Sequence, residues 1–197
     1  MRTSTWTSRS CRRGEGDDAA APLLILGIDP GTAVTGYGVV RADPRPALVE
    51  CGVIRTKAET PLPERLREIS EGVRELLARH RPDAMAVEAV FYARNVRTTI
   101  VLGHTRGVIL LAGAEANVPI HEYPPADIKK AVAGTGAATK TQVQFMLTKL
   151  PRLTRAPEPN DAADGVAAAL TCALRAPLAR ALAARPVTSG IGGRKGR

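Results

Sequence analysis

Four acidic residues occupy positions from which carboxylates could do chemistry. Asp29 follows a short apolar run, LLILGI, and Glu88 interrupts a second one, AMAVEAV. Asp161 and Asp164 are three residues apart at the start of DAADGVAAAL, a spacing that places both side chains on one face of a helix. Because hard divalent cations prefer oxygen ligands, these four residues predict a magnesium site wherever the fold gathers them.

Each acid also has a simpler interpretation. Asp29 could only start a turn with the proline that follows it. Glu88 could form a buried salt bridge with Arg94 or Arg97, since an unpaired carboxylate in an apolar strand is costly. The two acids of the helix could serve as favourable charges at its N-terminus, worth about 0.3–1 kcal/mol each. That last alternative explains one acid more easily than two, because so apolar a helix must be buried.

Such a set of carboxylates suits phosphodiester hydrolysis. Two Mg²⁺ ions about 4 Å apart can activate a water and stabilise the leaving oxygen in an in-line displacement. The sequence offers no competing zinc or Ser-His-Asp set, since its histidines lie in unrelated segments, at His80, His104 and His121. Its three cysteines are scattered and odd in number, which argues against a disulfide framework and predicts a reducing cytosol.

The net charge of +9 is unevenly distributed over the 197 residues. The tail 175–197 has six basic residues and no acid, whereas 89–157 has nine basic and three acidic residues. A basic segment beside an acidic cluster suits a protein that binds a polyanion and holds metal at the cut. An ordinary solvated basic surface would show the same counts. No apolar run is long enough to span a membrane.

The elements that must position the acids follow from hydrophobic periodicity and turn residues. Strands are predicted at 23–28, 37–42, 47–55, 83–90 and 118–123. Helices are predicted at 63–80, within 96–116, at 126–133 and 139–150, and from an N-cap at Asn160 onward. Residues 1–22 are interpreted as a disordered extension, 23–185 as one nuclease domain, and 186–197 as a disordered basic tail.

The order βββαβαβα predicts an α/β fold with a mixed five-stranded sheet and helices on both faces. Its first three strands form an antiparallel meander, and strands 23–28 and 83–90 are expected to be parallel neighbours. Asp29 and Glu88 would then meet at the carboxyl edge of the sheet, where open α/β sheets bind ligands.

Several motifs resemble the RuvC family of bacterial Holliday-junction resolvases. They are GIDPGTAVTGYGVV, IRTK (54–57), VEAVF (87–91), GHTRGV (103–108) and DAADGVAAAL (161–170), in register over about 23–175. The resemblance implies a ribonuclease H-like fold, a homodimer, two Mg²⁺ ions per site that Mn²⁺ can replace, and paired symmetric nicks across a four-way junction. It further implies a role in recombination and repair, beside a branch-migration motor of the RuvA and RuvB type.

The resemblance also assigns roles to residues. It makes Asp29, Glu88, Asp161 and Asp164 the catalytic, metal-binding carboxylates. It makes Phe91 an aromatic that stacks on a junction base, and it makes Lys129 and Lys140 phosphate ligands.

The residues themselves support part of this. Phe91 and Tyr92 follow the Glu88 strand and are flanked by Arg94 and Arg97, so they could stack on unpaired bases while the arginines hold phosphates. Phe91 could equally be a core residue.

For the two lysines the sequence argument differs. Lys140, at a predicted helix start, could hold a phosphate with the help of free backbone amides. Lys129 could belong to a solvated pair with Lys130. The apolar helix within 96–116 could contribute to a two-fold interface.

Three other functions compete. An actin-like phosphotransferase also begins with a strand and a DxGT turn, but this chain is short for two duplicated domains and has no second Asp-Gly phosphate loop after a later strand. A junction-binding module without catalysis would not need four acids facing DNA. Another ribonuclease H-like nuclease with a different branched substrate would share both fold and chemistry.

Overall fold

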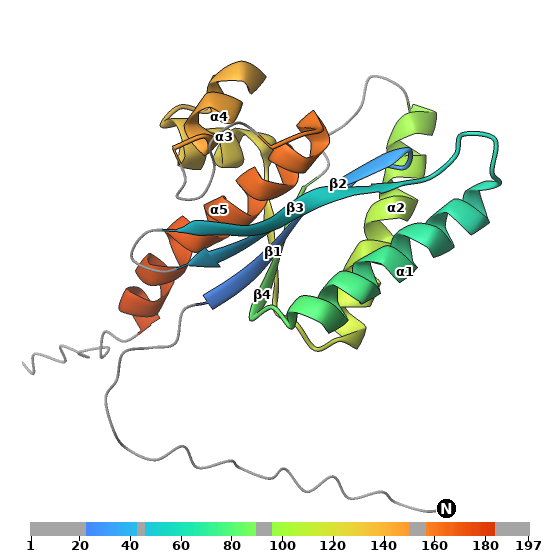
Figure 1. Cartoon of the computed structure of the whole chain (residues 1–197), viewed down its shortest axis with the longest axis horizontal. Coiled ribbons are helices and arrows are strands. Elements are labelled where there is room, and N and C mark those ends of the chain that lie inside the picture. Colours follow the sequence, from blue (N-terminus) through green and yellow to red (C-terminus); the bar gives the residue numbers. More distant parts are fainter. Residues whose placement is uncertain (1–22, 43–45, 90–95, 150–156, 184–197) are drawn as a thin grey trace, which may run out of the picture.

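A computed structural model describes residues 23–42, 46–89, 96–149 and 157–183, and these form a five-stranded sheet between two layers of helices (Figure 1). The strand order is β3-β2-β1-β4-β5. The antiparallel part comprises β1 (Leu23–Asp29), β2 (Val34–Ala42) and β3 (Ala47–Arg55). The parallel part adds β4 (Ala84–Glu88) beside β1 and β5 (Ile120–Tyr123) beside β4. The predicted mixed sheet is therefore confirmed.

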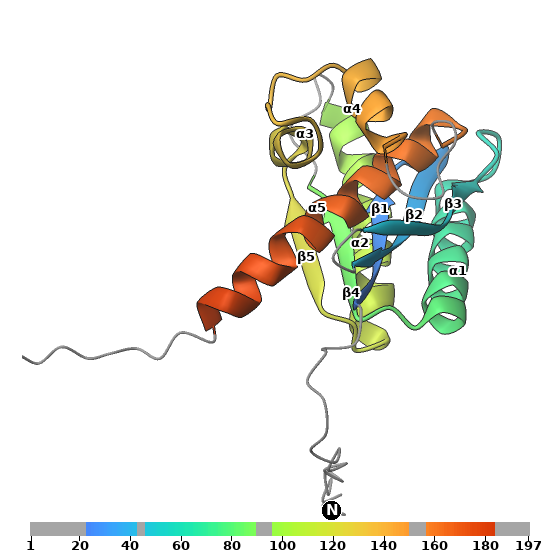
Figure 2. The same ribbon diagram turned by 60° about the vertical axis from the view of Figure 1, so that its left-hand side comes forward.

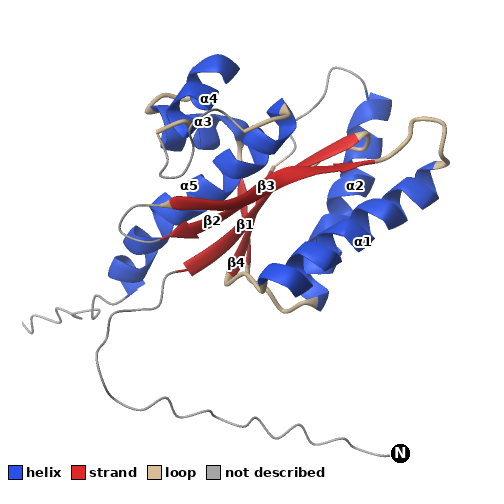
Figure 3. Cartoon of the chain, in the orientation of Figure 1, coloured by secondary structure: helices blue, strands red, loops and turns tan. Residues whose placement is uncertain are grey.

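The helices cover both faces, as the element order predicted. On one face lie α1 (Leu62–His80) and α2 (Val96–Glu115). On the other lie α3 (Pro125–Ala133), α4 (Lys140–Leu147) and the long α5 (Asn160–Ala183), which crosses the sheet obliquely (Figure 2). Figure 3 shows the strands enclosed between these two groups of helices. No helix in the described ranges is long and apolar enough to cross a membrane.

Successive side chains along β1 and β4 point to opposite faces of the sheet, so the core has two halves. Ile25 and Ala86 face the α3, α4 and α5 side, whereas Leu26, Ile28 and Met85 face α1 and α2. Because the central strands are covered on both faces, they are apolar throughout, as parallel strands in α/β proteins are. Polar residues are therefore expected only at their ends, which is where Asp29 and Glu88 stand.

Element boundaries differ from the prediction by a few residues. β2 begins at Val34, three residues earlier than predicted, because Val34 pairs with Arg55 and leaves only a short turn after Asp29. β4 and β5 are shorter than predicted, and α4 ends at Leu147. Asn160 is the first helical residue of α5, and its side-chain oxygen accepts a hydrogen bond of 2.8 Å from Gln144.

Candidate active site

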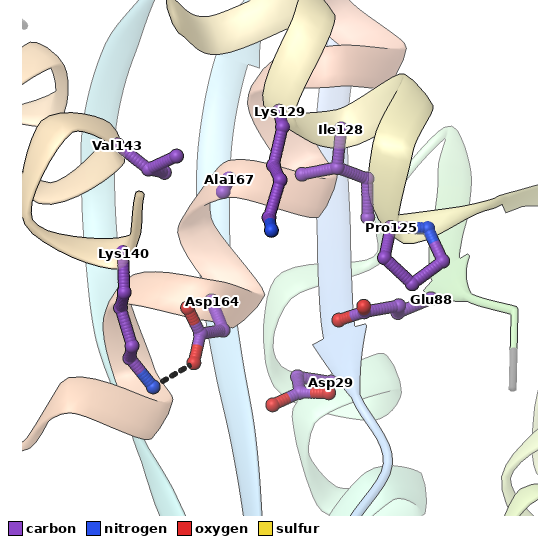
Figure 4. Close-up of a pocket in the computed structure, with 9 residues that line it drawn as sticks. All are labelled: Asp29, Glu88, Pro125, Ile128, Lys129, Lys140, Val143, Asp164 and Ala167. Carbon is purple, nitrogen blue, oxygen red and sulfur yellow. Dashed lines mark hydrogen bonds and ion pairs between the residues drawn. The ribbon is translucent and has the colours of Figure 1, made fainter. Parts of the chain in front are cut away.

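Asp29 and Glu88 lie side by side at the carboxyl edge of the sheet. β1 and β4 are parallel, and their register pairs Ile28 with Val87, so the next residue on each strand is one of the two acids. Both side chains are half-buried and line one pocket of about 320 Å³ (Figure 4). The expectation that two distant acids meet here is confirmed.

The first turn of α5 brings the other two carboxylates to the same place. Oxygens of Asp29, Asp161 and Asp164 lie within 4.8 Å of one another. Two oxygens on one Mg²⁺ can be at most about 4.2 Å apart, twice the metal–oxygen bond length. Small side-chain movements would therefore let these three groups share a cation, and Glu88 lines the same pocket beside Asp29.

The packing of α5 on β2 fixes this approach. Gly36 pairs with Asp29 across the sheet, and a Cβ on Gly36 would overlap the backbone carbonyl of Asp161. Likewise, a Cβ on Gly165 would contact the backbone of Tyr37. Backbone therefore lies against backbone where helix meets strand, a separation that only glycine permits. This close approach places the start of α5 directly beside the end of β1.

Two lysines complete the pocket on its α3 and α4 side. Lys140 is the first residue of α4, behind a capping box in which the hydroxyl of Thr139 accepts from the backbone of Gln142. Its ammonium group donates to Asp164 at 2.6 Å. Lys129 reaches the pocket from α3, and its ammonium group points towards the space between Asp164 and Glu88 (Figure 4). Both lysines named in the sequence analysis are thus found at the carboxylate cluster.

Electrostatics in the pocket favour a bound cation. Burial, followed by the charge and hydrogen bonding of Glu88, raises the pKa of Asp29 from 3.8 to about 8. Burial also raises the pKa of Glu88. Burial lowers the pKa of Lys140, but its bond to Asp164 outweighs burial and raises it overall. A divalent cation would replace the protons that these carboxyl groups retain because they are buried and lie beside one another.

A hydrogen-bonded clamp holds the turn that follows Asp29. The hydroxyl of Thr56 donates to the carbonyl of Thr32 at 2.6 Å, and its backbone amide donates to Ala33 at 3.1 Å. Arg65 donates to the same hydroxyl at 2.9 Å. The side chain of Thr32 also bonds the buried Thr105 of α2 at 2.9 Å. Sequence reasoning missed this clamp, although Thr56 lies within the IRTK motif.

The predicted DNA-contacting residues between β4 and α2 fall mainly outside the described residues. These are Phe91, Tyr92 and Arg94. Arg97 is exposed in the first turn of α2. Among the described residues, three charges shift the pKa of Glu88: Asp164 raises it, and Lys140 and Lys129 lower it.

The sheet order, the helices on both faces and the acidic pocket at the carboxyl ends of β1 and β4 define a protein of the ribonuclease H-like fold. Solved structures agree. The chain is similar to Thermus thermophilus RuvC, with a TM-score of 0.74 and 37% identity over 80% of this chain and 97% of that one. It is equally similar to T. thermophilus RuvC in complex with Holliday junction substrate, with a TM-score of 0.73. The yeast mitochondrial resolvase Ydc2 shares the fold at 14% identity.

Sequence comparison identifies the family. The family model for crossover junction endodeoxyribonuclease RuvC matches residues 25–172. A protein of that name from Pelotomaculum thermopropionicum is 48% identical over 75% of this chain and 91% of its own length. Another, from Parafrankia sp., is 49% identical over 88% of this chain and its entire length. The chain belongs to the RuvC family and is a crossover junction endodeoxyribonuclease, a hydrolase. The family implies dependence on a divalent metal, and the acidic cluster of Asp29, Asp161 and Asp164 is consistent with it.

Proposed function

We propose that this enzyme resolves four-way Holliday junctions by paired symmetric nicks during recombination and repair. The observation that carries the proposal is the convergence of Asp29, Glu88 and Asp164 with two lysines in one pocket, with Asp161 beside Asp29 and Asp164. Carboxylates for metal beside ammonium groups for phosphate are the requirements of a nuclease. The relatives are named crossover junction endonucleases, and one solved relative contains a junction.

The donor set fits magnesium, with two ions per site and manganese as a substitute. All ligands would be carboxylate oxygens, and Glu88, Asp164 and Asp161 all lie close enough to Asp29 for their charges to act on it. When bound, the ions would supply an activated water and stabilise the leaving oxygen. Asp29 would give up the proton that its raised pKa lets it keep, and Lys140 would hold Asp164 in place.

Lys129 and Lys140 are proposed to hold the phosphates on either side of the scissile bond. Phe91 is proposed to stack on a base at the crossover, with Tyr92, Arg94 and Arg97 contacting the same strands. Phe91 is three residues from Glu88, so even a fully extended chain keeps the two Cα atoms within about 11 Å of each other. A residue this close to the scissile bond can position the DNA strand where it enters the metal pocket.

A homodimer would supply the second, symmetric nick. Small and apolar residues of α2 form one stripe along its outer face, at Val96, Ile100, Gly103, Gly107 and Leu111. Val96, Ile100 and Leu111 are 74%, 55% and 52% exposed, and a Cβ on either glycine would meet nothing within 4 Å. A second copy of α2 would cover this stripe, because small residues let two helices approach closely. We infer that the dimer acts in the cytoplasm beside a branch-migration motor of the RuvA and RuvB type.

A metal titration on synthetic DNA tests the function. We expect Mg²⁺-dependent nicks at symmetric positions in an immobile four-way junction and no cutting of a linear duplex of the same sequence. Asp29→Asn should reduce cleavage at least about 100-fold while leaving junction binding intact or stronger. Equal cutting of both DNAs would indicate a ribonuclease H-like nuclease with another substrate, and unchanged nicking by Asp29→Asn would exclude that carboxylate from the site.

A further inference from the structure

The buried residues of α2 include one polar side chain. Thr105 has no exposed surface, and it shares the inward face of the helix with small and apolar residues: Ile109, Ala112 and Gly113. A buried hydroxyl is costly unless it has a hydrogen-bond partner, whereas an alkyl side chain needs none. The partner of Thr105 is the hydroxyl of Thr32, at 2.9 Å. This contact, rather than packing, explains why a threonine occupies the position.

Thr32 belongs to the turn that follows Asp29, and this turn is held as one unit. The hydroxyl of Thr56 donates to the carbonyl of Thr32 at 2.6 Å, as part of the clamp described above. The fully buried Thr35 donates to the carbonyl of Gly31 at 2.7 Å. Because neighbouring carbonyls of the turn are both bonded, a displacement of Thr32 would be passed to Asp29, three residues earlier in the chain. The position of Asp29 therefore depends on what holds Thr32.

The outer face of α2 bears the exposed stripe that is proposed above to contact a second copy. Gly103 and Gly107 belong to that stripe, and each is two residues from Thr105. With 3.6 residues per turn, side chains two positions apart point to nearly opposite sides of a helix. One helix, about 10–12 Å across, therefore separates the partner copy from the turn after Asp29. Figure 1 shows this turn, at the end of β1, against α2.

We propose that the hydrogen bond between Thr105 and Thr32 couples the dimer face of α2 to the metal pocket, so Thr105 is a positioning residue for Asp29. A second copy on the outer face would fix α2, and α2 would fix the turn. Coupling between two sites is reciprocal, so a cation held by the carboxylates should in turn strengthen the dimer. The inference rests on the dimer of the proposed function and extends it to a connection between the interface and each active site.

Sedimentation of the protein without DNA tests the coupling apart from catalysis. The dimer dissociation constant is measured in saturating Mg²⁺ and in a chelator. Thr105→Val removes the hydroxyl and keeps the branched shape, and Thr105→Ser keeps the hydroxyl. Thr171 is equally buried in α5, where its hydroxyl donates to the carbonyl of Ala167 at 2.8 Å, so Thr171→Val is the matched control. Thermal denaturation in the chelator checks that all variants are folded.

We expect Mg²⁺ to tighten the wild-type dimer about tenfold, within the range that coupled sites usually show. Thr105→Ser and Thr171→Val should keep this ratio, and in Thr105→Val it should fall close to one. A wild-type dimer that Mg²⁺ leaves unchanged, or a full Mg²⁺ effect in folded Thr105→Val, would overturn the coupling and leave the proposed dimer and its function intact. A wild type that stays monomeric would instead reject the proposed dimer, and the coupling with it.

Cleavage measures the same coupling from the other direction. At saturating enzyme, the Mg²⁺ concentration for half-maximal nicking of a junction should be higher in Ile100→Glu, which removes the partner copy, and in Thr105→Val. The double variant should need little more Mg²⁺ than Thr105→Val alone, because both changes break the same connection. Effects that multiply would show that the two residues act independently and would contradict the proposal. Failure of the wild type to cut any junction would reject the proposed function, while the sedimentation result would still decide the coupling.

Discussion

Gly36 of β2 and Asp161 of α5 are in backbone contact, and this contact places an acid of the last helix beside Asp29 of the first strand. The two residues are far apart in the chain, and neither is apolar. The contact exists because Gly36 has no Cβ, so the helix start can lie directly on the strand. The geometry of the metal pocket thus depends on a residue that contributes no side chain to it.

Gly36→Ala adds only one methyl group, but it should disturb the geometry of the metal pocket strongly. The new methyl group would displace the first turn of α5 and, with it, both Asp161 and Asp164. We expect roughly 100-fold slower cleavage, because misplacing reacting groups by about 1 Å can cost that much. Single-turnover kinetics and thermal denaturation measure the two effects. Full activity with an unchanged melting temperature would show that the contact is not needed.

The pH dependence of stability should reveal the crowded carboxyl groups. Because the pKa of Asp29 is raised to about 8, the folded metal-free protein keeps a proton that the unfolded chain loses near pH 4. With a chelator present, the contribution of Asp29 to the free energy of unfolding should be complete below about pH 4. It should then fall as the pH rises towards 8, by at most about 1.4 kcal/mol per pH unit. Urea denaturation at several pH values measures the slope.

Two controls separate this slope from other titrations. Asp29→Asn should flatten the slope between pH 4 and 8, because an amide does not titrate. Saturating Mg²⁺ should flatten it as well, because the cation replaces the proton. The interpretation fails if the slope is the same in the wild type and in Asp29→Asn.

Lys129 and Lys140 should each contribute one phosphate contact. Replacing either residue by Ala should lower the dependence of log affinity on log salt by about 0.9. Lys130 is exposed on α3 and does not line the metal pocket, so Lys130→Ala is the matched control and should leave the salt dependence unchanged. Junction binding is measured by anisotropy over a salt series. Equal effects from all three variants would point to a diffuse basic surface.

Thr56 should act as a positioning residue for Asp29. Thr56→Val removes both hydroxyl bonds of the clamp and keeps the backbone bond to Ala33. We expect cleavage to slow about tenfold at saturating enzyme and the Mg²⁺ requirement to rise, with junction affinity unchanged. Thr56→Ser retains the hydroxyl and should restore both values. A loss of stability alone, with normal cleavage of the folded fraction, would assign Thr56 a purely structural role.

The stripe on α2 should determine the oligomeric state. Ile100→Glu would place a charge at the centre of the proposed interface, and sedimentation should then show a monomer that makes single rather than paired nicks. Val49 is an exposed apolar residue on β3, and Val49→Glu should remain dimeric. A wild type that is monomeric at micromolar concentration would reject the interface.

The local sequence was sufficient to predict the helices and strands and to single out the acids of the site. Apolar runs ending in an acid identified β1 and β4, since a buried strand has few places for a carboxylate. The spacing of Asp161 and Asp164 identified the acidic face of α5, and the motifs indicated the RuvC family. Lys140 was predicted from its place at a helix start, a purely local signal.

Tertiary structure alone decided which distant groups touch. Lys140 binds Asp164, Thr56 clamps the turn after Asp29, and Lys129 lines the metal pocket from α3. None of these relations has a periodicity or a spacing in the sequence, because each depends on how helices and strands pack in three dimensions. Gly36 shows the physical reason most clearly. The lack of a side chain at this residue matters only because α5 packs against it in the folded protein.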